Sequence, residues 1–301
     1  MLNLAELMVL ACERWKTKVE FDVACKPHQS RPGAFYIHLN GKNFGFDGNS
    51  SPFNPIAASK VCKSKIDTID LVNQVQLKAG AHVPKTRANY DPDLHEAGAR
   101  DEKLRRFLAT VDDICADAAG VFTLPVIVKP NSKSMSVNGS LARTPEELRE
   151  SIEQIFADSQ DYDSDAIVQE RIDIKTEYRA VCFDGQNMML IERDTQNATP
   201  NDILNPVFWE GTRNKLVFDE ELAMASEEIA EVLKDKIGLR YTGFDMARDH
   251  DGKIWFIEAN SAPMIAVDEM IHDDEGMAAL LDLTDTMFVS MAEEVGIDLG
   301  Y

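Results

Sequence analysis

Basic residues are scarce in this chain of 301 residues, where 31 lysines and arginines stand against 52 aspartates and glutamates. The formal net charge of −21 argues against a nucleic acid or an anionic membrane surface as a partner, because both would repel the chain at long range. A small anion is not excluded, since it responds to the cations in its immediate surroundings.

Cysteine and histidine are also sparse, and neither residue forms a recognisable motif. The five cysteines are scattered, and no two form a CxxC pair, which favours a reducing compartment; we therefore expect a cytoplasmic protein with mostly buried, inert thiols. The six histidines form no HExxH motif, so a zinc site is not expected. GxSxG, GxGxxG and GxxxxGK[ST] motifs are missing as well.

Long hydrophobic runs are missing too, and no segment approaches the length of a membrane span. The first residues, MLNLAELMVLACERW, lack a basic leader and are interrupted by Glu6, which predicts an amphipathic helix rather than a signal peptide. With 44% hydrophobic and 28% charged residues, the chain has a globular composition and is long enough for two or three compact units.

The order of predicted elements indicates an α+β fold, because helices are mixed with antiparallel hairpins. Residues 1–60 are expected to form a small α/β region, and the loop-rich stretch DGNSSPFNP at 47–55 is a candidate boundary. The predicted helices are Lys65–Ala79, ended by Gly80, then Thr144–Phe156, capped by Thr144, Glu220–Lys236, ended by Gly238, and 275–295. The predicted strands are Lys18–Cys25, Ala34–Leu39, Leu124–Lys129, Ala166–Glu170, and Glu177–Asp184 with Met188–Arg193 around a Gly185-Gln186 turn.

The segment YTGFDMARDHDGKIWFIEAN, residues 241–260, is the most informative part of the chain. Two apolar runs flank Asp251-Gly252, which predicts a hairpin with these two turn residues and pairs 250 with 253 and 249 with 254. Continued outward, this register puts Asp245 opposite Glu258, with Asn260 on the same face.

Opposed like charges repel across a sheet, so this face requires an explanation. Three hard oxygen ligands are what Mg²⁺ prefers, normally together with phosphate oxygens. The alternative is a solvated acidic face on an edge hairpin. The neighbouring Phe244, Trp255, Phe256 and Ile257 indicate a covered sheet and favour the metal site.

Several other residues could bind a nucleotide, although each signal is weak by itself. Lys129 ends an apolar strand, so its ammonium group needs an anion or water nearby. The serine-rich loop after it contains Ser134 and Ser136. This loop could present hydrogen-bond donors to phosphate, or it could be a plain surface loop. Glu170 ends the next strand and Glu177 follows after a short connector, a spacing suited to an adenine amino group and a ribose. Arg179 and Arg193 could bind phosphate or carboxylate, or form surface ion pairs.

Three segments, taken in order, resemble the ATP-grasp superfamily of carboxylate–amine ligases: LPVIVKPNSKSMSVNG, AIVQERIDIKTEYRAV and TGFDMARDHDGKIWFIEANSAP. The first is similar to D-alanine–D-alanine ligases, and EYRAVCFDG with LIER is similar to cyanophycin synthetase and bifunctional glutathione synthetase modules. The resemblance covers roughly residues 60–265. It implies an ATP-grasp fold in which two α/β subdomains, 61–173 and 174–301, clasp the nucleotide after the short region 1–60.

The resemblance also implies a role for each candidate residue. Lys129 and the loop Ser132–Ser140 would contact the ATP phosphates, Arg179 and Arg193 would steady the transferred phosphoryl group, and Arg213 would face the acceptor. Adenine and ribose would be bound by Glu170, the backbone near Arg171 and Asp173, and Glu177. Two Mg²⁺ ions, or Mn²⁺ in their place, would be held by Asp245, Glu258 and Asn260.

The implied reaction has two steps. A substrate carboxylate attacks the γ-phosphate of ATP and becomes an acyl-phosphate; an amine then displaces phosphate to form an amide. The implied substrates are amino acids or small peptides, and a homodimer is one oligomeric state that the resemblance allows.

The chain departs from the family pattern at three positions. A second ATP lysine would fall near Ile69, and the nearest candidate is Lys65. Gly243 and Met264 replace an arginine and a glycine of the D-alanine ligases. The resemblance therefore does not imply D-alanine as the substrate. Two alternatives therefore stay open: an ATP-grasp kinase or an enzyme that modifies a protein or peptide tail, and a non-catalytic ATP sensor.

Overall fold

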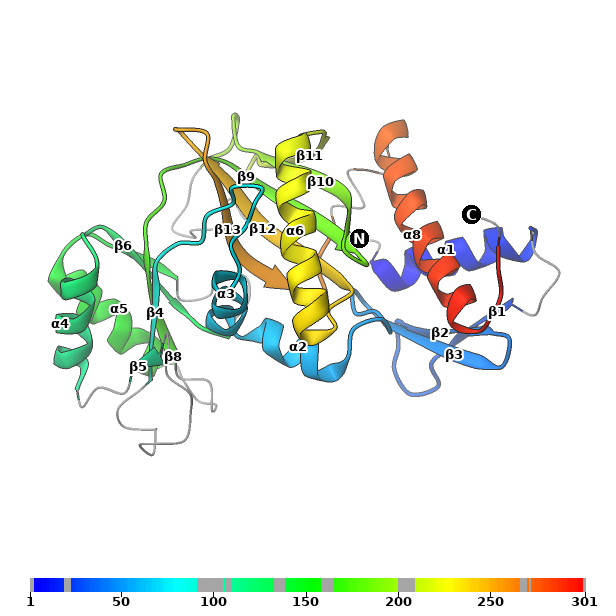
Figure 1. Ribbon diagram of the computed structural model, residues 1–301, viewed down its shortest axis with the longest axis horizontal. Coiled ribbons are helices and arrows are strands. Elements are labelled where there is room, and N and C mark those ends of the chain that lie inside the picture. The colour runs from blue at the N-terminus through cyan, green and yellow to red at the C-terminus, as the bar shows by residue number, and fades with distance from the viewer. Residues whose placement is uncertain are drawn as a thin grey trace.

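The computed structural model describes residues 3–18, 23–90, 105–106, 110–132, 139–157, 165–199, 209–265, 270 and 272–299. The described strands form three sheets, and the α+β prediction is confirmed. The central sheet has the antiparallel order β11-β10-β9-β12-β13 and lies in the middle of the molecule in Figure 1. Its strands are β9 (Ile174–Phe183), β10 (Gln186–Asp194), β11 (Arg213–Val217), β12 (Tyr241–Asp249) and β13 (Ile254–Asn260).

A second sheet, of order β5-β4-β8-β6-β7, lies beside the central one (Figure 1). It contains β4 (Thr86–Tyr90), β5 (Arg105–Arg106), β6 (Val126–Pro130), β7 (Ser140–Ala142) and β8 (Asp165–Glu170). Helices α4 (Val111–Val121) and α5 (Pro145–Ala157) pack on it around a separate apolar core. Helix α5 begins as predicted, because the Thr144 hydroxyl accepts a hydrogen bond from the Glu147 N–H at 3.2 Å.

The two faces of the central sheet are buried by different elements. Helices α2 (Ile56–Lys63), α3 (Lys65–Asn73) and α6 (Glu220–Ile237) share an apolar core with one face. The other face packs at its Val181–Phe183 end against α1 (Leu4–Lys16), α8 (Asp274–Glu294) and the third sheet, which consists of β1 (Val23–Pro27), β2 (Ala34–Leu39) and β3 (Lys42–Asp47). The predicted domain boundaries stay a prediction, but residues 4–53 and α8 clearly share one core.

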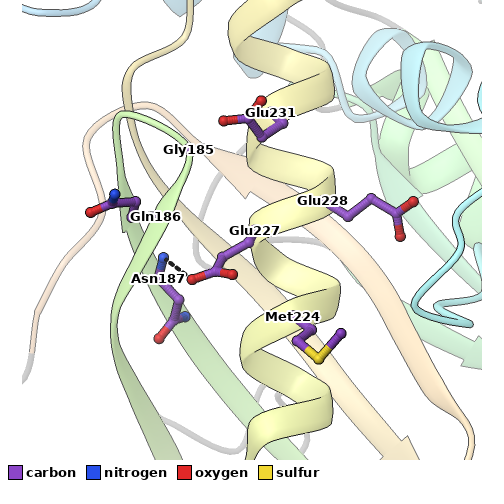
Figure 2. Close-up of a pocket in the computed structure, with 7 residues that line it drawn as sticks. All are labelled: Gly185, Gln186, Asn187, Met224, Glu227, Glu228 and Glu231. Atoms are coloured by element: carbon purple, nitrogen blue, oxygen red, sulfur yellow. Dashed lines mark hydrogen bonds between the residues drawn. The ribbon is translucent and has the colours of Figure 1, made fainter.

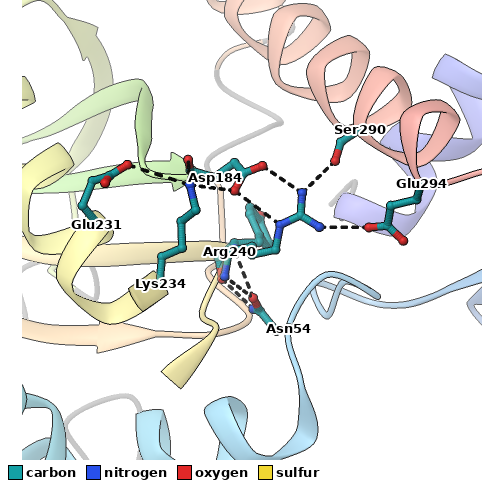
Figure 3. A network of polar contacts seen from close by, with 8 residues as sticks. Asn54, Asp184, Glu231, Lys234, Arg240, Ser290 and Glu294 are labelled. Carbon is teal, nitrogen blue, oxygen red and sulfur yellow. Dashed lines mark hydrogen bonds and ion pairs between the residues drawn. The ribbon is translucent and has the colours of Figure 1, made fainter. Parts of the chain in front are cut away.

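A polar network around Arg240 joins these layers (Figure 3). The guanidinium donates to Asp184 at 2.8 Å, to Ser290 of α8 at 2.8 Å and to Glu294 of α8 at 2.9 Å. The Asn54 side chain accepts hydrogen bonds from the Arg240 and Tyr241 N–H groups at 3.0 and 2.9 Å. The network therefore fixes the first residues of β12 relative to α8 and to the loop before α2.

Two predicted local features are wrong in detail. The helix from Lys65 ends at Asn73, because Lys78 and Ala79 instead donate their N–H groups to Glu228 of α6. The turn between β9 and β10 uses Asp184 and Gly185, with φ of 54° and 92°, rather than Gly185-Gln186. Positive φ at both turn residues matches the twist of an antiparallel hairpin.

Other predictions agree with the structure. Helix α6 stops where Gly238 adopts a left-handed conformation, as expected for a C-terminal cap. Within the described ranges, no helix is long and apolar enough to cross a membrane.

Candidate active site

The β12–β13 hairpin places Asp245 directly opposite Glu258, as predicted, and Gly243 opposite Asn260. The two carboxylates and the amide therefore occupy neighbouring positions on one face of the central sheet. Their neighbours Phe244 and Phe256 are fully buried, which agrees with the covered sheet that the sequence indicated.

The turn that produces this register differs from the predicted one. The Asp249 N–H donates to the Lys253 carbonyl at 3.0 Å, so residues 250–252 form a three-residue loop with Gly252 at φ +84°. The pairs 250 with 253 and 249 with 254 are thus wrong. The Asp249 carboxylate stabilises the longer loop by accepting the N–H groups of Asp251 and Lys253, each at 2.9 Å.

A bulge in β13 corrects the register before the acidic pair. Arg248 pairs with Ile254 and Met246 with Phe256, but Asp245 pairs with Glu258, so Ile257 is the extra residue. The longer turn and the bulge offset each other, and the facing carboxylates result from both.

Two arginines from neighbouring strands neutralise Asp245. Arg179 lies opposite Asp245 on β9, and its Nη2 is 3.0 Å from Asp245 Oδ1 and 3.3 Å from Oδ2. Arg193 on β10 donates through Nη2 to the same Oδ1 at 2.9 Å and through Nη1 to Glu177 at 2.9 Å. Burial raises the pKa of Asp245, but Arg179 and Arg193 outweigh burial and lower it below its usual range.

Two lysines approach the same acids from the side of the second sheet. Lys65, the first residue of α3, lies 3.7 Å from Glu258. Lys129 on β6 has its pKa lowered to about 8, because burial and the charge of Lys65 outweigh the attraction of Glu258, Asp245 and Glu177. The repulsion expected between Asp245 and Glu258 is therefore offset by cations on two sides.

Asn131 positions the start of α3, a role that the sequence did not reveal. Its side chain accepts the Ile66 N–H at 3.1 Å and donates to the Ser64 hydroxyl at 3.0 Å, while its carbonyl accepts from Lys65 Nζ at 3.3 Å. Asn131 is only 4% exposed, so these hydrogen bonds between the end of β6 and α3 are shielded from water. The only sequence signal was a polar residue directly after the Lys129-Pro130 strand end.

Gly243 is required by close packing over its Cα. A Cβ there would lie 2.4 Å from the Pro263 Cβ and 3.1 Å from Arg179 Cδ. The glycine that departs from the D-alanine ligase pattern thus makes room for Arg179, which reaches across from β9. Sequence reasoning noted Gly243 but missed its connection to Pro263 and Arg179.

The predicted adenine residues lie in the connector between the second sheet and the central sheet. Glu170 ends β8 and accepts the Lys85 N–H at 2.7 Å. Arg171 and Asp173 form an ion pair at 3.7 Å, and the Asp173 carbonyl accepts the His250 N–H at 3.4 Å. Glu177 is bound by Arg193, and burial raises its pKa despite that cation.

Three predicted site residues are not placed in this cluster. Arg213 pairs with Asp194 on edge strand β11, while its neighbour Asn214 pairs with Arg193, so Arg213 is exposed on the opposite face of the sheet. Ser134 and Ser136 lie outside the described residues.

The ligand set fits Mg²⁺ in type and placement, with one complication. In the described part of the chain, no group of three His, Cys, Asp or Glu could hold a metal, so a three-residue ligand set with Asp245 and Glu258 would have to include the Asn260 amide. Glu258 lies 3.7 Å from Lys65 and also forms a side-chain hydrogen bond with Asp245. The Asp245 oxygens already interact with Arg179 and Arg193.

A surface hollow on the opposite, α6-covered side of the sheet does not belong to this cluster (Figure 2). Its acidic residues have partners of their own: Glu227 accepts the Asn187 N–H at 3.2 Å, Glu228 accepts two N–H groups of the loop after α3, and Glu231 lies 3.8 Å from Lys234. These carboxylates therefore have a structural explanation.

Comparison with known proteins supports the ATP-grasp resemblance. The model of the family "YheC/D like ATP-grasp" matches residues 184–284. A curated relative, the formate-dependent phosphoribosylglycinamide formyltransferase of Ignicoccus hospitalis, is 25% identical over 162 residues. That alignment covers 50% of this chain but only 38% of the relative, so the chain spans well under half of that protein's length.

Solved structures have the same fold at low sequence identity. D-Alanine–D-alanine ligase from Bacillus anthracis has a TM-score of 0.53 at 19% identity, covering 80% of this chain and 72% of the ligase. D-Cycloserine synthetase DcsG also has a TM-score of 0.53, at 18% identity, covering 78% and 73% of the two chains. The three motif segments, the strand arrangement and these similarities agree: this chain has the ATP-grasp fold.

Proposed function

We propose that this protein is an ATP- and Mg²⁺-dependent ligase that joins a carboxylate to an amine. One observation carries the proposal: Lys65, Lys129, Arg179 and Arg193 surround the facing acids Asp245 and Glu258. Phosphoryl transfer needs charge neutralisation and in-line positioning more than a protein nucleophile, and such a cluster supplies both.

The phosphate groups of ATP would lie between the two sheets. Lys129 and Lys65 reach this space from β6 and α3, and we assign both to the phosphates. We also assign Ser134 and Ser136 to the phosphates, on the basis of the sequence pattern alone.

The adenine and ribose would lie at the connector after β8. Glu170, Arg171 and Asp173 sit in this connector, next to the tip of the β12–β13 hairpin. We assign adenine to these three residues and the ribose hydroxyls to Glu177.

Asp245, Glu258 and Asn260 would hold Mg²⁺, which when bound neutralises phosphate charge and orients the γ-phosphate for in-line attack. The number of ions, two in our proposal, follows from the family resemblance, and Mn²⁺ suits the same oxygen ligands.

In the proposed reaction, the substrate carboxylate attacks the γ-phosphate, and ADP leaves. The amine then displaces phosphate from the acyl-phosphate and forms the amide. Arg179 and Arg193 would stabilise negative charge on the transferred group. We leave Arg213 as a candidate for the acceptor side, although it faces away from the cluster.

Amino acids or small peptides are the proposed substrates. This assignment rests on the names of fold neighbours, which include D-alanine–D-alanine ligase and a D-Ala:D-Ser ligase. We also propose a cytoplasmic location from the cysteine pattern; a homodimer remains the oligomeric state to test first.

The test is an ADP-release screen over amino acids and dipeptides, with hydroxylamine present to trap an acyl-phosphate as hydroxamate. ADP release together with hydroxamate is the expected result. ADP release without hydroxamate, with a phosphorylated product, would replace the ligase by a kinase. Tight ATP binding with no release for any substrate would instead indicate a sensor.

A further inference from the structure

Asp245 is bound by two arginines, which would compete with a metal ion for its carboxylate. Its Oδ1 accepts a hydrogen bond from Arg193 at 2.9 Å and lies 3.0 Å from Arg179 Nη2, while Oδ2 accepts from the same Nη2 at 3.3 Å. Arg179 Nη2 thus lies within 3.3 Å of both Asp245 oxygens, one of which also accepts from Arg193. A cation that coordinates Asp245 must therefore compete with Arg179 for the carboxylate.

The two arginines are held very differently. Arg193 bridges Glu177 and Asp245 with both ends of its guanidinium, and its side chain is only 5% exposed. Arg179 contacts Asp245 through Nη2 alone, and its Nη1 is buried with no hydrogen-bond partner among the described residues. Moving Arg179 therefore breaks one ion pair, whereas moving Arg193 breaks two, with Glu177 and with Asp245.

The packing around Arg179 places its stem along the site. Its stem crosses Gly243, where even a Cβ would come within 3.1 Å of Arg179 Cδ. Gly243 is paired with Asn260, so the arginine lies over the space between the predicted metal ligands Asp245 and Asn260. A guanidinium displaced from Asp245 would stay close to any substrate held there.

We propose that Asp245 is shared between Arg179 and the metal, so that metal binding releases the Arg179 guanidinium to an anionic oxygen of the substrate carboxylate or its acyl-phosphate. Arg193 remains on Glu177 and Asp245 throughout. An unpaired buried guanidinium is costly, so the released Arg179 favours binding of an anion, and the metal and the anionic substrate bind cooperatively. The proposal rests on the proposed function in placing the metal at Asp245 and in naming the substrate carboxylate and its acyl-phosphate.

The decisive experiment measures the affinity of the full chain for Mn²⁺ alone, from the electron paramagnetic resonance signal of free Mn²⁺. Arg179→Met removes the competitor for Asp245 and should tighten Mn²⁺ binding about tenfold, a coupling of ordinary size. Lys175→Met is the matched control, because Lys175 is exposed on the same strand and removes one positive charge without freeing Asp245. An Arg179→Met gain no larger than the Lys175→Met gain, or any loss, overturns the proposal.

A second measurement covers the case in which Arg179→Met does not fold. In the wild-type protein, the Arg179 Nε resonance, assigned with Arg179→Lys, should shift when Mg²⁺ is added, while that of Arg248 should stay in place. Arg248 is a suitable reference because it is bound to Asp219 at 2.7 Å, away from the cluster. An Arg179 signal that does not respond to Mg²⁺ contradicts the proposal. Neither readout uses turnover, so this inference can fail while ADP release and hydroxamate formation still support the ligase.

Discussion

At the scale of single residues, the candidate site depends on charges that stabilise one another. Asp245 would be costly to bury alone, but two guanidinium groups neutralise it, and its pKa falls although burial opposes this. Lys129 shows the reverse balance, because burial and Lys65 lower its pKa to about 8 despite three nearby carboxylates. A lysine that loses half its charge near about pH 8 is a sensitive probe of the phosphate assignment.

Lys129 should make ATP use depend on pH. As the pH rises through about 8, the free protein loses the Lys129 proton, and kcat/KM for ATP should fall in steady-state assays. Lys129→Arg keeps its charge and should show no fall between about pH 7 and about pH 9. A Lys129→Arg profile that falls like the wild type would assign the pH dependence to another group.

The same shift has the opposite effect on stability. Lys129 is lowered from 10.5 to about 8, so between these values the unfolded chain binds more protons than the folded one. The free energy of unfolding should therefore gain a contribution from this residue as the pH rises from about 8 towards about 10.5, and urea titrations at several pH values would detect it. Lys129→Arg should lack the gain, and an equal gain in that variant would show that Lys129 does not cause it.

At the scale of the elements, the sequence predicted the acidic pair correctly but through a turn that is wrong. Asp251-Gly252 suggested a two-residue turn, whereas Asp249 caps a longer loop and a bulge at Ile257 restores the pairing. Neither feature has a local pattern that distinguishes it. The opposition of Arg179 to Asp245 depends on strand order, because β9 lies between β10 and β12, and order is a tertiary property.

Other elements were predictable because their signals are local. Gly238 ends α6 and Thr144 caps α5, since each uses chemistry confined to one turn of helix. The helix from Lys65 ended early because its last predicted residues bind Glu228, a distant partner that no local propensity reveals. The family resemblance predicted the ATP-grasp fold. The packing of Gly243 against Pro263 is a tertiary contact, and no local sequence pattern predicts it.

Gly243→Ala should damage the site through packing alone. Its methyl group would lie 2.4 Å from a proline ring carbon, so we expect a loss of about 2 kcal/mol in the free energy of unfolding and displacement of Arg179. Urea denaturation and ADP release would both report the change. Gly120→Ala in α4 is the matched control: with open space around it, it should stabilise the fold by about 0.5 kcal/mol. A Gly243→Ala protein as stable as the wild type would contradict the packing assignment.

At the scale of the whole molecule, residues 4–53 and α8 support the central sheet from its second face. Trp15 of α1 stacks on Phe288 of α8 with ring centroids 5.0 Å apart, and both belong to the core that includes Val181 and Ile191. The strands that carry Arg179 and Arg193 are thus stabilised by the two ends of the described chain. The Arg240 network adds polar contacts between the same layers (Figure 3).

Phe288→Ala should therefore destabilise the strands that carry the site residues, although Phe288 itself lies in α8. Removing this fully buried ring should cost about 3 to 4 kcal/mol in urea denaturation and speed hydrogen exchange of β9 and β10 amides. Phe218→Ala, at a ring that is 91% exposed, should change stability by less than about 0.5 kcal/mol. Unchanged exchange in β9 and β10 would show that the two packed layers unfold independently.

The proposed ligase activity itself depends on the facing acids of the hairpin. Glu258→Gln preserves shape but removes one charge from the proposed metal site. Glu192→Gln makes the same change on the other face of the central sheet, opposite Lys215. The comparison therefore separates the site from a general effect of charge.

The most direct test measures ADP release and hydroxamate formation, in Mg²⁺ and with the best substrate from the screen, for the wild type and both variants. We expect Glu258→Gln to lose at least about a hundredfold in both readouts, and Glu192→Gln to stay within about threefold of the wild type. Full Mg²⁺-dependent activity in Glu258→Gln would contradict the proposed metal site and the ligase reaction built on it.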